Sequence, residues 1–98
     1  MKVFLSHAMS GLPEEEVMVI RKEAEDYLRS KYGDIEIVDN YHHENAPDNA
    51  GRLWHLGLSI QLMERVDAIY FVPGHSEEAK GCIVEKVICE LYGLKMLE

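Results

Sequence analysis

Long apolar runs are missing from this chain of 98 residues, and none approaches the roughly 20 residues that a membrane-spanning helix needs. Its first segment, MKVFLSHAMSG, has too few apolar residues for a signal peptide and is typical of a strand. Basic residues are also scarce, at 10 against 18 acidic ones, which gives a formal net charge of −8. Because this charge repels polyphosphate backbones and anionic lipids, we expect neither a nucleic-acid polymer nor a membrane as partner.

Cysteine is nearly absent as well, with two residues in the chain. Cys82 and Cys89 lie on one predicted helix, seven positions and roughly 10 Å apart along its axis, so they cannot bond to each other. Unpaired thiols are typical of a reducing compartment, and we expect a cytoplasmic protein in which both thiols are buried. The length predicts one domain, over residues 1–98.

Strand and helix patterns alternate along the chain. Strand patterns occupy residues 2–6, 35–38, 67–72 and 94–97, and helical patterns occupy residues 13–32, 51–65 and 78–92. The positions expected to face the core are Val17, Ile20, Ala24, Tyr27 and Leu28, then Leu53, Leu56, Ile60 and Met63, then Val84, Val87, Ile88 and Leu91.

This alternation predicts a small doubly wound α/β fold of the flavodoxin or Rossmann type. We expect a parallel sheet of four to five strands flanked by three helices. Ligands of such sheets bind beyond the carboxyl ends of the strands. The segments expected to meet there are residues 6–11, 39–47 and 73–81.

The third of these segments leads into a helix that carries Gly81 and, four positions later, Glu85. Both fall on one helix face, so the missing side chain at Gly81 would leave room for a ligand beside a carboxylate. Near the helix start the dipole would keep Glu85 ionised. The alternative is a solvated surface glutamate and a glycine that belongs to the helix cap.

Other patterns are less informative. The loop SHAMSGLP could hold a sugar hydroxyl or a phosphate on its N–H groups, or could simply cap a helix, and no G-x-G-x-x-G or G-K-[ST] pattern is present. No G-x-S-x-G elbow supports a serine or cysteine nucleophile. The chain has no C-x-x-C or H-E-x-x-H pattern, so we expect no metal site. We interpret His42 and His43 as exposed loop residues.

Three stretches together resemble the nucleoside 2-deoxyribosyltransferase-like family. They are MKVFLSHAMSGLP, VDAIYFVPG and AKGCIVEKVICELYGLKML, which follow one another in the family's order. The spacing of Gly81 and Glu85 matches the family's hallmark, and Asp67 with Pro73 and Gly74 reinforces the match.

The resemblance implies covalent chemistry at C1′ of a deoxynucleoside, with Glu85 as the catalytic nucleophile and without metal or organic cofactor. It also implies a homo-oligomer. The residues that it suggests for substrate binding are Phe4, Ser6, His7, Met9, Gly11, His42, Ser59, Gly74 and Gly81.

The chain departs from the family's pattern at several polar positions. Phe4 stands where a tyrosine usually orients the nucleophile, Ser59 replaces an aspartate, and Ala79 replaces a serine or aspartate. Three hypotheses follow: an enzyme in which His7 or His42 supplies the missing proton, a nucleoside- or nucleotide-binding module without turnover, and a structural or regulatory partner with a vestigial pocket.

Overall fold

The computed structural model describes all 98 residues as three helices around one sheet. The chain runs β1 (Lys2–Ser6), α1 (Glu14–Tyr32), β2 (Glu36–Ile37), α2 (Arg52–Met63), β3 (Ala68–Phe71), α3 (Lys80–Tyr92) and β4 (Met96–Leu97). The four strands are all parallel, in the order β2-β1-β3-β4. The predicted α/β class and doubly wound architecture are therefore confirmed, with four strands.

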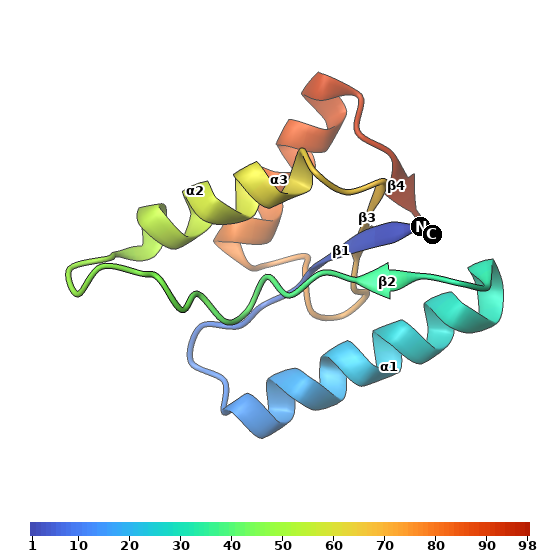
Figure 1. The fold of residues 1–98 in the computed structure, drawn as a ribbon, viewed down its shortest axis with the longest axis horizontal. Helices are drawn as coiled ribbons and strands as arrows, with labels where there is room; N and C mark the ends of the chain where they lie inside the picture. The colour runs from blue at the N-terminus through green and yellow to red at the C-terminus, as the bar shows by residue number, and fades with distance from the viewer.

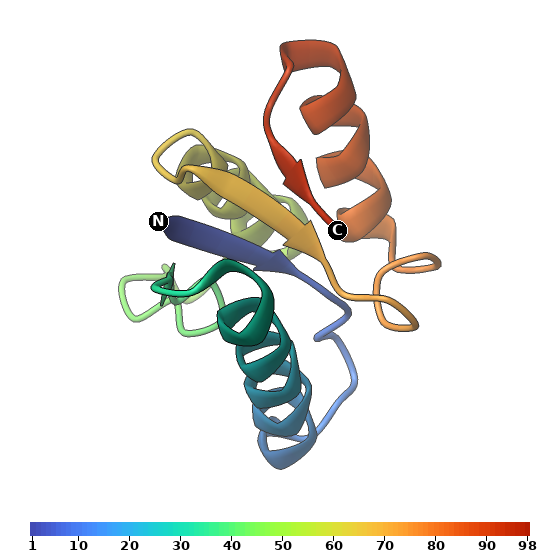
Figure 2. The same ribbon diagram turned by 90° about the vertical axis from the view of Figure 1, so that its right-hand side faces the viewer.

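The helices form a layer on each face of the sheet. In Figure 1, α1 lies below the strands, whereas α2 and α3 lie above them. Figure 2, turned by 90°, shows the same separation of α1 from α3 across the strands. The chain passes from β1 outward to β2 and then returns past β1 to β3, so the strand order reverses between β1 and β3 and puts the topological switch point beyond the carboxyl ends of these two strands.

Strand alternation divides the core in two. Val3 and Leu5 of β1 pack towards α1 with Ala24 and Leu28, whereas Phe4 packs on the opposite face. The second cluster joins Phe4 and Ile69 of the sheet to Met63 of α2 and Cys89 of α3. Both cysteines are free and buried, as predicted from the sequence.

The apolar stripe of α1 is predicted correctly, except for Tyr27. Val17, Ile20, Ala24 and Leu28 are buried, while Tyr27 is exposed and stacks on Tyr70 at a ring distance of 5.8 Å. Acidic residues in its first turn and Arg29 and Lys31 in its last turn complement the helix dipole.

The predicted inward faces of α2 and α3 are partly wrong. On α2, Met63 is buried, but Leu53 is 81% exposed. On α3 the buried residues are Cys82, Glu85 and Cys89, whereas Val84, Val87 and Leu91 face outward. The helix carries apolar side chains on both sides, so its periodicity alone does not select the face that packs on the sheet.

The remaining boundaries differ little from the prediction. The second strand is limited to two residues, and α3 begins at Lys80 with Ala79 as its N-cap. It ends at Gly93, whose φ of 67° places it in the left-handed region and whose N–H bonds to the carbonyl of Cys89. No helix in the structure combines the length and the apolar character that crossing a membrane requires.

Candidate functional site

The three segments predicted to meet at the carboxyl ends of the strands do meet there. The backbone N–H of Ala8 donates to the carbonyl of His75 at 2.6 Å, which joins the first loop to the third. The Asn40 side chain donates to the carbonyl of Leu5 at 2.9 Å, which joins the second loop to β1. These bonds hold the loops together around the end of β1.

The centre of the site is a buried pair, Ser6 and Glu85. Ser6 shares its strand face with Phe4, so its side chain points towards α3. The Ser6 hydroxyl donates to Glu85 Oε1 at 2.7 Å, and both residues are buried. This chain has Phe4 at the position where the family that it resembles usually has a tyrosine. Ser6, two positions later on β1, supplies a hydroxyl that bonds to the glutamate.

Burial dominates the ionisation of Glu85. Loss of hydration raises the pKa of this carboxyl to about 7, against the opposing effect of the Ser6 hydrogen bond. The residue is the sixth of α3, beyond the first turn where the helix dipole is strongest. The prediction that the dipole keeps Glu85 fully ionised is therefore wrong, because near neutral pH both forms are populated.

The second oxygen of Glu85 remains in contact with solvent. No fully buried side-chain oxygen or nitrogen lacks a hydrogen-bond partner, and Ser6 is the one donor to this carboxylate. Because Oε2 accepts no hydrogen bond within the protein, it must keep some exposure to solvent. The opening is narrow, since Glu85 as a whole is 6% exposed.

The Leu56 side chain of α2 borders the space beside Gly81. A Cβ built on this glycine would lie 3.7 Å from Leu56 Cδ1, an ordinary van der Waals contact. Ser59, further along α2, is also buried. The expected room for a ligand next to Gly81 is therefore limited on one side by Leu56.

His7 comes directly after β1, and its ring lies towards α1, where it meets Arg21. Its Nδ1 lies 3.1 Å from the carbonyl of Ala8, so this nitrogen carries the proton, and its Nε2 lies 3.0 Å from Arg21 Nη1 and must accept. Burial, with Arg21 nearby, lowers the pKa of His7. The ring is held neutral on the wrong face, so it cannot supply the proton that the sequence hypothesis assigned to it.

His42 occupies a different position again. Its two ring nitrogens lie 2.9 Å from Asp39 Oδ2 and 2.9 Å from Glu14 Oε1. Both carboxylates accept, so both nitrogens donate, and these hydrogen bonds raise the pKa of His42. The imidazolium is exposed beside the start of α1, and none of its hydrogen bonds reaches the Ser6–Glu85 pair.

The other residues suggested by the resemblance have structural roles. Phe4 has no exposed surface and belongs to the core, so it offers no surface to a ligand. The carbonyl of Met9 accepts a hydrogen bond from the backbone N–H of Leu12, and Gly74 donates its N–H to Glu77 Oε2 at 3.0 Å. Gly11 is exposed in the first loop with a φ of 81°.

Sequence reasoning missed Arg21 and Asn40. Arg21 Nη1 donates to Asn40 Oδ1 at 2.8 Å, and its Nη2 donates to the carbonyl of Val38 at 3.0 Å. Asn40 is buried directly after the second strand, and its position at a strand end was the one available signal. On α1, Arg21 follows Ile20 of the buried stripe, so its stem enters the protein beside that stripe.

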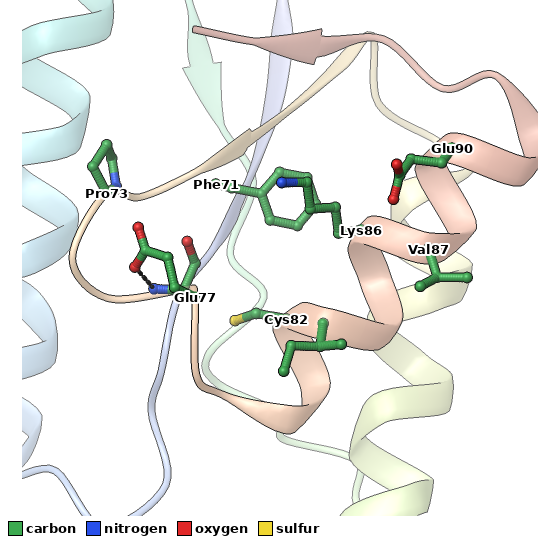
Figure 3. A pocket seen from close by; sticks show the side chains of 9 residues that line it. Phe71, Pro73, Glu77, Cys82, Lys86, Val87 and Glu90 are labelled. Atoms are coloured by element: carbon green, nitrogen blue, oxygen red, sulfur yellow. Dashed lines mark hydrogen bonds between the residues drawn. The ribbon is translucent and has the colours of Figure 1, made fainter.

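Two hollows lie near the site, and Glu85 lines neither. The first, of about 520 Å³, lies between the end of β3 and α3 and is drawn in Figure 3. The second, of about 490 Å³, lies between the 39–45 loop and α2 and includes His42, His43 and Trp54. At its edge, Nδ1 of His43 lies 2.6 Å from Nδ1 of His55, so the two rings share one proton between them.

No group of three or more histidine, cysteine, aspartate or glutamate side chains is placed to hold a metal ion. Comparisons of the chain with protein-family models, curated proteins and solved structures gave no match.

Proposed function

We propose that this protein acts on the N-glycosidic bond of a deoxynucleoside or nucleotide, with Glu85 as the nucleophile, as the family resemblance implies. The observation that carries the proposal is the Ser6–Glu85 bond of 2.7 Å beneath the topological switch point of a parallel sheet. A buried carboxyl with a pKa of about 7 is typical of catalytic residues and less common among structural ones.

In the proposed reaction, ionised Glu85 attacks C1′ through Oε2 while Ser6 holds Oε1. An ester bond to C1′ forms, the bond from C1′ to the base breaks, and the base leaves with the bonding electrons and takes a proton from solvent water. Water or a second base then attacks C1′, loses a proton to solvent and releases the carboxylate, which gives hydrolysis or transfer with retained configuration.

The second candidate is a nucleoside- or nucleotide-binding module without turnover. It is favoured by the lack of a proton donor, because the neutral His7 faces α1 and His42 is bound to two other carboxylates. In that case Glu85 would accept hydrogen bonds from sugar hydroxyls and would not attack carbon. Under either function we propose a cytoplasmic homo-oligomer.

The test is incubation with the four deoxynucleosides and their 5′-monophosphates, with and without a free acceptor base, followed by chromatography of the bases. We expect free or exchanged base, lost in Glu85→Gln, which keeps the shape of the side chain. Glu78→Gln is the matched control, since Glu78 is exposed just before α3. Binding by calorimetry without base release would support the second candidate, and the absence of both signals would contradict both.

A further inference from the structure

The outward side of α3 is apolar. Four residues form this outer α3 face, and their exposed fractions are 48% for Ile83, 40% for Val84, 47% for Val87 and 76% for Leu91. The opposite side of the helix already packs on the sheet through Cys82 and Cys89. A helix that is apolar on both sides is typical of one covered on both sides, so the outer α3 face is expected to contact a partner.

The outer α3 face contains both a projection and a hollow. Ile83 and Val87 line the hollow of about 520 Å³, together with Phe71 at the end of β3. Figure 3 shows Phe71 reaching into it from the strand and Lys86 from the helix. Leu91, the most exposed of the four residues of the face, lies one turn beyond Val87 and projects next to this hollow. A surface with both features can receive its own copy, as a two-fold interface requires.

The charges beside the face are arranged in the same self-complementary way. Lys86 and Glu90 lie one turn apart on one flank of α3, and neither forms an ion pair within the chain. When two copies of a helix pack antiparallel about a two-fold axis, the same flank of each helix lies next to that flank of the other. An axis near Val87 therefore puts Lys86 of each copy within side-chain reach of Glu90 of the other.

The local charge also suits a second copy despite the net charge of −8. Around the outer α3 face, Lys80 and Lys86 offset two of the three charges of Glu77, Glu78 and Glu90, so two copies meet there with little net charge. Most of the excess acidic residues lie elsewhere, for example in the first turn of α1. A strongly basic partner would find no acidic patch on this face to recognise.

We propose that two copies of this chain form a symmetric dimer through their outer α3 faces, packed antiparallel with Leu91 of each copy against Ile83 and the hollow of the other. Glu85 points to the opposite side of α3, so the dimer leaves the Ser6–Glu85 pair uncovered. The proposal names the interface of the homo-oligomer proposed above, and it does not depend on the chemistry assigned to Glu85.

Sedimentation equilibrium of the full chain, at protein concentrations across the micromolar range, tests the proposed dimer. We expect a mass twice that of one chain, and a monomer for Val87→Asp, whose side chain is half exposed and outside both core clusters, with circular dichroism confirming its fold. Lys86→Glu should weaken the dimer by about tenfold or more, because it puts like charges together at both ends. Adding Glu90→Lys to that variant should restore the affinity to near that of the wild type.

The control is Leu53→Asp, which changes an apolar residue on α2 that is 81% exposed, against 47% for Val87, and should leave the dimer intact. A wild-type chain that stays monomeric would overturn the proposal. A dimer that dissociates with Leu53→Asp but not with Val87→Asp would move the interface to α2. Failure of the charge exchange to restore association would overturn the antiparallel arrangement.

Discussion

Glu85 and Ser6 show how two single residues set the chemistry of the site. A carboxylate buried among apolar atoms loses hydration, and one hydrogen bond from a neutral hydroxyl does not compensate for that loss. The pKa of Glu85 therefore rises from 4.5 to about 7 even though Ser6 favours the ionised form. A carboxyl with a pKa near 7 can exchange a proton near neutral pH, which suits general acid–base chemistry.

This pKa predicts a pH dependence of stability. Because the folded protein holds a proton on Glu85 that the unfolded chain releases near pH 4.5, the stabilisation is complete below that pH and is lost as pH rises through about 7. The upper bound of this loss is about 3 kcal/mol. Urea denaturation at pH 5 and pH 8 should therefore show a larger loss of unfolding free energy for the wild type than for Glu85→Gln.

Glu78→Gln serves as the control, because this exposed side chain should leave the wild-type pH dependence in place. Equal losses for the wild type and Glu85→Gln would mean that the glutamate is not desolvated in solution.

In the second loop, residues 38–51, the Asn40 side chain joins the chain to both β1 and α1. Asn40 donates to Leu5 of β1 and accepts from Arg21 of α1, and its carbonyl accepts from His43 at 3.0 Å. Nδ1 of His43 lies 2.6 Å from Nδ1 of His55 on α2. Asn40 therefore connects the loop to β1 and α1 through its side chain, and to α2 through its carbonyl and His43. A loop without regular structure is kept in one place by these polar bonds more than by apolar packing.

Replacement of Asn40 tests whether its side chain anchors the second loop. Asn40→Ala leaves the Leu5 carbonyl and one Arg21 N–H without partners in a buried place, which should lower the unfolding free energy by about 2 to 4 kcal/mol. Asn45→Ala, in the exposed part of the same loop, should cost less than about 0.5 kcal/mol. If chemical denaturation gave similar values for both variants, Asn40 would not be the anchor of the loop.

For the whole molecule, the charge balance limits the substrate. A net charge of −8 opposes a polyanion, whereas a single nucleoside carries no charge and a monophosphate carries little. We therefore expect that base release, where it occurs, is confined to free nucleosides and nucleotides. Fluorescence anisotropy with single- and double-stranded oligodeoxynucleotides at low salt should show no binding, and chromatography should show no base release from them.

Removal of bases from an oligonucleotide at a rate near that for the free nucleoside would contradict this expectation.

Comparison of the sequence prediction with the structure separates the parts that local pattern controls from those that it does not. The element types, the parallel sheet and the α1 stripe follow from periodicity, because each repeats a backbone rule over many residues. The position of His7 was beyond the reach of such a rule, because it follows the end of β1 and its ring is placed by Arg21 of α1.

The amino-acid sequence by itself determined the order and type of the elements and the three loops that gather at the carboxyl ends of the strands. The tertiary structure alone decided which side of α3 faces the sheet, because that helix carries apolar side chains on two opposite sides. Ser6, 79 positions away in the chain, provides the hydrogen-bond partner of Glu85, and packing around the pair gives Glu85 its pKa. A contact between residues so distant in sequence leaves no local sequence pattern. It exists only in the folded protein, and so does the pKa that depends on it.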